Sequence, residues 1–202
     1  MIISTGKGRA GKINITTDGG ATFAVSAFVW YSSGLSDGDD VTEEELDELR
    51  LASDTALAYD SALKYLTNRA HAEKELFNKL KMKYSVEAAS RAVEKCRAAG
   101  LTDDEKFASL YAEELYSHKN YAPSRIKAEL ENRGIDKITA ENAVLALDID
   151  RDSGIIKILD KMKITAESGE KDRMRAVRRL LAAGYSMGEI RRHLPSGFSE
   201  EL

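Results

Sequence analysis

The sequence contains a single cysteine, Cys96, among its 202 residues. One cysteine excludes a disulfide within the chain and a multi-cysteine metal cluster, and it is typical of proteins in a reducing compartment. No apolar run approaches the roughly 20 residues that a membrane-spanning helix needs. Residues 1–12 lack the apolar core of a signal peptide. We therefore expect a soluble cytoplasmic protein that does not associate with a membrane.

Motifs of catalytic sites are also scarce. The chain has no Walker A sequence, no GxSxG motif and no GxGxxG between a predicted strand and a predicted helix. Its three histidines, His71, His118 and His193, include no pair at metal-ligand spacing, which favours ordinary surface or capping roles. We therefore expect a protein that is not an enzyme and that holds no metal ion or cofactor.

The acidic pair Asp103-Asp104 is the one cluster that resembles a catalytic dyad. The pair follows Thr102, and Glu105 comes three residues after that threonine, which is the spacing of a helix-capping box. Carboxylates in a first helical turn are stabilised by the helix dipole. Since no histidine or metal-ligand spacing accompanies the pair, the pattern favours a helix start over a paired-carboxylate site.

Charge is distributed unevenly along the chain. Residues 1–60 hold 4 Lys/Arg against 11 Asp/Glu, a net charge of -7, whereas the whole chain has a net charge of only -4. From Lys171 to His193 there are seven basic and two acidic residues, a net charge of +5. The C-terminal part of the chain is therefore the part most suited to a polyanion or an acidic partner.

Residues 12–31 are the only segment with a convincing β pattern. Isoleucines alternate with polar residues before a turn signal at residues 18–20, and apolar residues alternate after it. The pattern predicts a β-hairpin. Because an isolated hairpin is marginal in water, we expect it to pack on another element, with Phe28 and Trp30 as the anchors.

From about residue 54 onward the chain is predicted to be helical, and a pattern recurs along it every 50 residues. Leu80, Leu130 and Leu180 occupy equivalent positions. Gly134-Ile135 and Gly184-Tyr185 mark equivalent turns, whereas Lys83-Tyr84 takes that place in the first unit. A repeat of this length that carries three helices implies a stacked helical array, in which each unit buries a face against its neighbours.

Apolar spacing also predicts which helix faces are buried. In the second unit the predicted stripe consists of Phe107, Leu110, Tyr111 and Leu115. In the third unit it consists of Met174, Val177, Leu180 and Leu181. On that third-unit helix, Arg175, Arg178 and Arg179 fall on a different face. After the glycine turn, Ser186 and Glu189 predict a capping box that opens a short helix.

Two interpretations of the arginine-rich segment stay open: contact with phosphate or an acidic partner, and a solvated face. A helix, a glycine turn and a capped helix with arginines also describe a helix-turn-helix that reads DNA. Weaker basic positions occur at equivalent places in the other two units. The candidate site for binding DNA or an acidic partner therefore comprises Arg173, Arg175, Arg178, Arg179, Arg191, Arg192, Lys79, Lys81, Arg125, Lys127 and Arg133.

Two runs in the helical part carry a family resemblance. Residues 100–108 read G-x-x-D-D-x-x-F-A, and residues 123–135 read P-x-R-I-x-x-E-L-x-x-R-G-I. In combination these runs resemble the RecX family, the bacterial regulators of the RecA recombinase. The resemblance covers residues 60–147 well and residues 150–194 more loosely.

The resemblance implies a mainly α fold of three tandem three-helix repeats in an elongated, curved array, with a small β-hairpin extension at the N-terminus. We expect an extension and acidic connector at residues 1–40. A helical lead-in and the first repeat follow at residues 41–101, the second repeat at residues 102–148, and the third repeat and tail at residues 149–202.

The resemblance also implies a function. The expected protein is a negative modulator of RecA that binds in the groove of the RecA filament on single-stranded DNA. It limits ATP hydrolysis and strand exchange in homologous recombination, DNA repair and the SOS response. We expect a monomer, and direct binding to DNA is left open. The alternative that the residues themselves offer is a helix-turn-helix transcriptional regulator.

Overall fold

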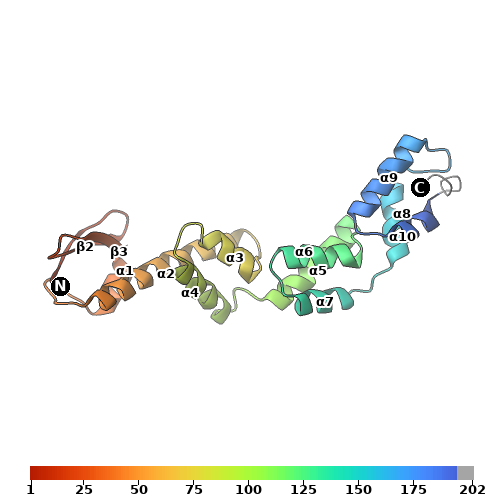
Figure 1. The fold of residues 1–202 in the computed structure, drawn as a ribbon. Helices are drawn as coiled ribbons and strands as arrows, with labels where there is room; N and C mark the ends of the chain where they lie inside the picture. Colours follow the sequence, from red (N-terminus) through yellow and green to blue (C-terminus); the bar gives the residue numbers. More distant parts are fainter. Residues whose placement is uncertain (195–202) are drawn as a thin grey trace. The chain divides into compact units, whose positions relative to one another are not determined.

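A computed structural model describes residues 1–194 of the chain. The described part contains three strands and ten helices (Figure 1). It divides into two compact units, one of Met1–Asp103 and a second that begins at Asp104. None of the helices in residues 1–194 combines the length and the apolar composition of a membrane-spanning segment.

The N-terminal sheet has three strands where the sequence predicts two. Strands β1 (Ile3–Lys7), β2 (Lys12–Thr17) and β3 (Thr22–Ser26) form an antiparallel sheet in the order β1-β2-β3. The hairpin prediction is confirmed for β2 and β3, whose register pairs Ile13 with Val25. Strand β1 gives little sequence signal, because Ile3 is its only buried residue. Its antiparallel pairing with β2 therefore defines it as a strand, although its residues do not alternate between apolar and polar.

The segment after β3 is helical and not extended. Helix α1 (Ala27–Ser33) begins directly after the strand, so the predicted β pattern stops at Ser26. Residues two apart share a face of a strand but lie on nearly opposite faces of a helix. Trp30 is accordingly buried in the core with Ile3, whereas the side chain of Phe28 is 76% exposed. Trp30 is thus an anchor and Phe28 is not.

Helix α2 (Glu43–Asn68) contributes to two hydrophobic cores. It begins at a capping box, in which the Thr42 hydroxyl accepts the N–H of Glu45 at 3.1 Å. Its first half places Leu46 and Leu49 in the core of the sheet. Its second half places Ala58 and Ala62 in the core of the first three-helix unit. One continuous helix therefore serves both the sheet and the first repeat.

The remaining helices form the predicted three-helix units. Helix α2 packs with α3 and α4, α5 packs with α6 and α7, and α8 packs with α9 and α10. The helices beyond α2 are α3 (Glu73–Leu80), α4 (Val86–Ala98), α5 (Asp104–Lys119), α6 (Pro123–Asn132), α7 (Lys137–Leu145), α8 (Arg151–Lys161), α9 (Glu170–Ala182) and α10 (Met187–His193). The prediction of three tandem three-helix repeats is confirmed.

Glycine turns separate the second and third helices of two units. Gly134 and Gly184 have φ values of 95° and 94°, a region that glycine adopts without strain. The apolar residue after each glycine, Ile135 or Tyr185, is buried. In the first unit Tyr84 is half-buried at the equivalent place, and its hydroxyl lies 2.8 Å from the Ser61 hydroxyl. The turn thus returns an apolar side chain to the core in two repeats.

The buried faces of α5 and α9 differ from the stripes that large apolar residues predict. In α5 the buried residues are Ala108, Ala112 and Leu115, while Leu110 is 63% exposed. In α9 they are Ala176, Val177 and Leu180, while Leu181 is 44% exposed. Alanine allows helices to approach closely, so small residues define these contact faces in place of the larger neighbours.

The start of α5 lies one residue later than the predicted cap. Helix α5 begins at Asp104, so Asp103 directly precedes it. The hydroxyl of the buried Thr102 donates to the Glu73 carboxylate at 3.2 Å. Arg97 pairs with the same carboxylate, and together these contacts lower the pKa of Glu73. The acidic pair therefore marks a helix start, as predicted, but Thr102 belongs to the packing of the first unit.

Candidate partner-binding surface on the third repeat

Helix α9 presents a basic face away from the core of the third repeat. Its buried residues pack against Ile155 and Ile158 of α8 and Ile190 of α10. Lys171, Arg175 and Arg178 follow one another at i, i+4 and i+7 on the opposite face, and all three are exposed. Arg179 is exposed beside them. We call Lys171, Arg175, Arg178 and Arg179 the α9 basic face.

The charges of the α9 basic face are not neutralised within the described part of the chain. Arg175 and Arg179 form no ion pair with any residue of 1–194. The Nε of Arg178 donates to the carbonyl of Met174 at 3.3 Å, a bond that leaves its charge available. A guanidinium group offers paired donors that match phosphate and carboxylate oxygens. This face is therefore chemically suited to an anionic partner.

Arg173 points in a different direction from the other arginines of α9. It is half-buried, and its guanidinium group donates to the carbonyl of Ala166. This bond ties the loop before α9 to the helix. The bond to Ala166 turns this guanidinium group toward its own chain. A contact of Arg173 with a partner stays a prediction.

Helix α10 is fixed to α8 by an ion pair at its start and by a histidine–carboxylate contact at its end. At the start of α10, the backbone N–H of Ser186 donates to the Glu189 carboxylate at 2.8 Å, which confirms the predicted capping box. Arg151 of α8 pairs with the same carboxylate at 2.8 Å. At the other end, His193 lies 3.1 Å from Asp152. Arg191 and Arg192 are exposed in the last turn of this anchored helix.

The Glu189 contacts predict an acid-sensitive third repeat. Hydrogen bonds from Ser186, followed by the pairing with Arg151, lower the pKa of Glu189 from its ordinary value of 4.5 to about 2. Because the folded pKa is the lower one, its stabilisation is present above 4.5 and is lost as the pH falls through about 2. We expect Glu189→Gln to remove about 1–2 kcal/mol at neutral pH and to flatten this dependence.

Urea unfolding between these two pH values measures the effect. Glu167→Gln, at an exposed position in the loop before α9, is the matched control. A Glu189→Gln variant that keeps the wild-type pH dependence would contradict the assignment.

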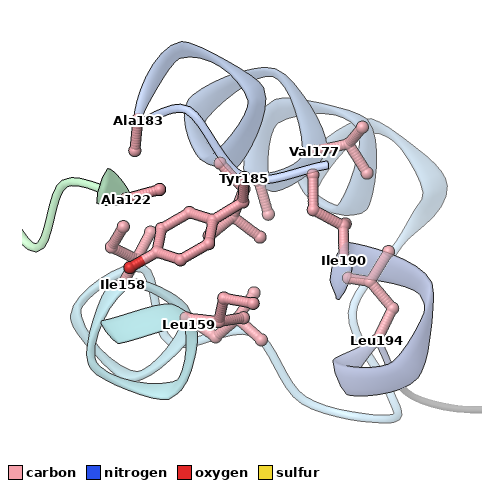
Figure 2. Close-up of a cluster of buried hydrophobic side chains, with 11 residues drawn as sticks. Ala122, Ile158, Leu159, Val177, Ala183, Tyr185, Ile190 and Leu194 are labelled. Atoms are coloured by element: carbon pink, nitrogen blue, oxygen red, sulfur yellow. The ribbon is translucent and has the colours of Figure 1, made fainter. Parts of the chain in front are cut away.

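Tyr185 joins the third repeat to the second. Its ring lies in the core between Ile158 and Ala122, as Figure 2 shows. Its hydroxyl donates to the carbonyl of Asn120 at 2.9 Å, and burial raises the pKa of Tyr185 to about 12. A Cβ atom at Gly154 would lie 2.0 Å from the same hydroxyl oxygen, so glycine is required there. The tyrosine therefore fits a space shaped by both repeats.

Backbone contacts strengthen the same junction. The N–H of Ala122, at the start of α6, donates to the carbonyl of Ala183 at 2.9 Å, and the Ser124 hydroxyl donates to the carbonyl of Gly184 at 3.0 Å. A Cβ atom at Gly184 would lie 2.5 Å from the Cβ of Arg125. Arg125 is therefore the predicted site residue that the structure brings from the second repeat to the turn between α9 and α10.

The other predicted basic residues of the second repeat have partners within it. Arg125 itself pairs with Glu129 at 2.6 Å, and Lys127 pairs with Glu141 at 2.9 Å. The guanidinium carbon of Arg133 lies 4.3 Å from the centre of the Tyr111 ring. The two ion pairs reduce the charge that is available to a partner. The sequence does not reveal them, because several join different helices.

In the first repeat, Lys79 and Lys81 lie over aromatic rings. The Nζ of Lys79 is 5.1 Å from the centre of the Tyr65 ring, and that of Lys81 is 5.4 Å from the Phe77 ring. Lys83, which we did not predict as a site residue, also lies over Tyr65, at 5.8 Å. Cation–π pairs leave the ammonium charge intact. A common surface of these lysines with the α9 basic face stays a prediction.

His71 is buried and does not have the surface or capping role that we predicted. It packs edge-on to Tyr65, and its Nδ1 lies 3.3 Å from the Glu75 carboxylate. Burial and the nearby Arg69 lower the pKa of His71, so its neutral form is favoured. Although burial acts to raise the pKa of Glu75, the contacts with Arg69 and His71 lower it to about 2. The cluster is a buried polar contact of the first repeat.

Residues 1–194 offer neither a metal-ligand cluster nor an activated cysteine. They contain no set of three or more His, Cys, Asp and Glu side chains that could hold a metal ion. Cys96 is buried, and burial raises the pKa of its thiol, which disfavours the nucleophilic thiolate. What the described residues do offer is a set of outward cations on a rigid helix.

Comparison with known proteins places this arrangement in a family. One family model, described as RecX, first three-helix domain, matches residues 58–96. Another, described as RecX, second three-helix domain, matches residues 103–144. The chain belongs to the RecX family. The two matches coincide with the helices of the first and second repeats, while α9 and α10 lie beyond them.

Curated RecX proteins extend the similarity to the third repeat. The regulatory protein RecX of Bacillus velezensis is 28% identical over 194 residues, which cover 93% of this chain and 73% of that protein. The RecX of Clostridium botulinum (strain Eklund 17B) is 23% identical over 95% of this chain and 92% of its own length. Other matches are partial. The chain spans 69% of the Caldanaerobacter subterraneus RecX and 48% of the Levilactobacillus brevis RecX.

Solved RecX structures have the same fold. A crystal structure of regulatory protein RecX has a TM-score of 0.63 with 22% identity, and the match covers 94% of this chain and 95% of the other. The structure of RecX from Lactobacillus salivarius has a TM-score of 0.54 with 24% identity over 70% of this chain. The similarity establishes the RecX fold for the described residues.

Proposed function

We propose that this RecX chain is a negative modulator of RecA, and that it binds along the groove of the RecA filament on single-stranded DNA. Binding there lowers the ATP hydrolysis and strand exchange of RecA in recombination and DNA repair. Membership of a family of regulatory proteins supports a regulatory role. The observation that carries the proposal is the α9 basic face, whose arginines point outward without neutralising partners among residues 1–194.

The proposal assigns different weights to the predicted basic residues. Arg175, Arg178 and Arg179 make the main contact, and Arg191 and Arg192 extend it at the end of α10. The basic residues of the first two repeats, Lys79, Lys81, Arg125, Lys127 and Arg133, make weaker contacts, and two of them, Arg125 and Lys127, are already paired with carboxylates. The protein acts as a cytoplasmic monomer without a cofactor, and it catalyses no reaction itself.

Single-stranded-DNA-dependent ATP hydrolysis by the cognate RecA tests the proposal. We expect hydrolysis and strand exchange to fall at fewer than one chain per RecA subunit, because an array of three repeats reaches more than one subunit of a filament. A matched reaction with a RecA filament preformed on the same DNA separates inhibition of assembly from binding to the filament. Unchanged hydrolysis and unchanged strand exchange would remove the main claim.

A helix-turn-helix regulator of transcription is the alternative function, and α9, the glycine turn and α10 are the feature that favours it. A recognition helix reads bases mainly with its N-terminal residues. The N-terminal residues of α10 are Met187, Gly188 and Glu189. The carboxylate of Glu189 already binds Ser186 and Arg151. The same helix-turn-helix geometry also recurs in the other two repeats. These features favour the RecA modulator.

Duplex binding distinguishes the two functions. A sequence-reading protein prefers one selected duplex over random duplex, whereas contacts with phosphates alone give sequence-independent binding. That affinity falls with salt by ~0.9 log units per phosphate contact for each log unit of salt concentration. Anisotropy measurements on both duplexes at two salt concentrations therefore decide between them. A strong preference for one duplex that persists at high salt would favour the alternative.

A further inference from the structure

An apolar groove lies in the N-terminal unit, and none of the basic residues proposed to contact RecA lines it. It has a volume of about 580 Å³ and runs between α1, α2 and α4. Its apolar lining consists of Phe28, Val29, Leu35, Leu49, Ala52 and Ala56. Polar residues form its rim, among them Glu45 and Glu48 of α2 and Lys95 of α4. We call this cleft the α1–α4 groove.

The floor of the α1–α4 groove is a stripe of α2. Leu49, Ala52 and Ala56 recur at three- and four-residue spacing along it, and the rim residues Glu45 and Glu48 continue the stripe toward the start of α2. At 1.5 Å per residue, the stripe is roughly 16 Å long, or three helical turns. Ala52 and Ala56 are only half-buried, so another helix can approach the α2 backbone closely there. The dimensions suit a short amphipathic helix.

Two side chains show that the groove is not closed by its own chain. Phe28 lies at the rim with 76% of its surface exposed, although an exposed phenylalanine contributes little to stability. Thr55 is buried beneath the groove, and its hydroxyl has no hydrogen-bond partner within residues 1–194. An occupant would cover the ring of Phe28 and deepen the burial of the apolar floor.

The charges beside the groove are mostly negative. Glu48 also lines a neighbouring groove of about 500 Å³, together with Glu44, Asp47, Asp54 and Glu87. The one basic residue lining that neighbour, Arg50, is paired with Asp47. Arg91, which lies between the two, is neutralised by Glu48 and Glu87 at 2.8 and 2.9 Å. Lys95 is the exception, and it lies on the α4 side of the apolar groove.

We propose that the α1–α4 groove binds a basic amphipathic helix of a protein partner. The apolar side of that helix lies on the stripe of α2 and under Phe28. Its lysines and arginines reach the carboxylates of Glu44 and Asp54 in the neighbouring groove. Charge complementarity selects this occupant, since residues 1–60 carry a net charge of -7 and an acidic helix is repelled.

Model peptides test the proposal with the full-length chain. The probe is a fluorescent helical peptide of leucine and lysine, with leucine at helical spacing, and the comparison peptide has glutamate in place of lysine. We expect the lysine peptide to bind and the glutamate peptide to bind at least about tenfold more weakly. Added salt should weaken binding of the lysine peptide, because its charged contacts lie at the exposed rim.

Two exposed aromatic residues of α1 provide a matched pair of variants. Phe28 lines the groove, whereas Tyr31, 78% exposed, does not. We expect Phe28→Ala to weaken binding of the lysine peptide by about tenfold or more, and Tyr31→Ala to leave it unchanged. Ala52→Glu, which places a charged side chain on the floor, is expected to abolish binding. Circular dichroism checks that each variant keeps the helical content of the wild type.

Several results would overturn the proposal. Equal binding of the two peptides, or binding of neither at about 100 µM, excludes a basic helix as the occupant. A dimer in sedimentation that Phe28→Ala dissociates would make a second copy of the chain the occupant. Binding of a small apolar dye that Phe28→Ala removes, without any binding of the lysine peptide, would make the groove a small-molecule site. The RecA assay is independent of all these outcomes.

Discussion

Replacement of Tyr185 by alanine is expected to lower the free energy of unfolding of the C-terminal unit by about 3–5 kcal/mol. The ring is almost fully buried against both the third repeat and Ala122 of the second. The variant therefore leaves a cavity, and it also leaves the carbonyl of Asn120 without its donor. Urea unfolding followed by circular dichroism measures the loss.

Two variants separate the contributions of the ring and the hydroxyl. Tyr185→Phe keeps the ring and loses only the hydrogen bond, so we expect a cost of about 1 kcal/mol. Leu181→Ala shortens a half-exposed side chain of the neighbouring helix and should cost less than about 1 kcal/mol. If Tyr185→Ala cost no more than Leu181→Ala, the assignment of Tyr185 as the junction of the two repeats would be wrong.

Reversal of charge on the α9 basic face is expected to abolish regulation of RecA. In the triple variant Arg175→Glu, Arg178→Glu and Arg179→Glu, each change removes a cation and adds a repulsive charge toward an anionic surface. A loss of about 1 kcal/mol per position weakens binding to the RecA filament by about 100-fold or more. Fluorescence anisotropy with filaments on single-stranded DNA measures the affinity, and ATP hydrolysis measures the regulation.

A control variant with the same change of net charge distinguishes a surface from a general effect of charge. Lys64, Lys157 and Lys161 are exposed and lie outside the α9 basic face. Their reversal to glutamate is expected to weaken binding by less than about tenfold, because separated charges are screened by salt. Equal losses in the two triple variants would contradict a localised site. Loss of filament binding with unchanged affinity for bare DNA would indicate that the face contacts RecA itself.

The repeat register was predictable because it depends on spacing alone. Leu80, Leu130 and Leu180 recur at intervals of 50 and are all fully buried. The capping box of Ser186 and Glu189 was equally readable, since it needs only a three-residue offset, whereas the same spacing at Thr102 and Glu105 did not reveal that the Thr102 hydroxyl donates to Glu73. Both signals are local, so no knowledge of the tertiary structure was needed to find them.

Other features depend on contacts that spacing does not encode. Strand β1 forms because β2 pairs with it, and α1 interrupts what the alternation of apolar residues predicts as a strand. Leu110 and Leu181 fit a buried stripe as well as their smaller neighbours do, and only close helix packing puts alanines there instead. The sequence pattern therefore identified the helices but misplaced parts of their buried faces.

The candidate site shows the same division. Arg173 and Arg175 are indistinguishable in a list of basic residues, yet one bonds to the loop before α9 and the other is exposed. Lys79 and Tyr65 are 14 positions apart, so their contact follows from the packing of α3 on α2. The sequence could predict which segment is basic. It could not predict which of those charged side chains bond to other residues of the folded chain.

Helix α2 has a practical consequence for experiments that divide this protein. The similarity to the first RecX domain begins at residue 58, which lies inside α2. A chain shortened to start there would lose half of that helix, the floor of the α1–α4 groove and the residues Leu46 and Leu49 that pack in the core of the sheet. If such a shortened chain were inactive, the cause would be the broken helix α2, and the result would not show that residues 1–57 have a function of their own. Boundaries drawn from sequence similarity are therefore unsafe cutting points in this chain.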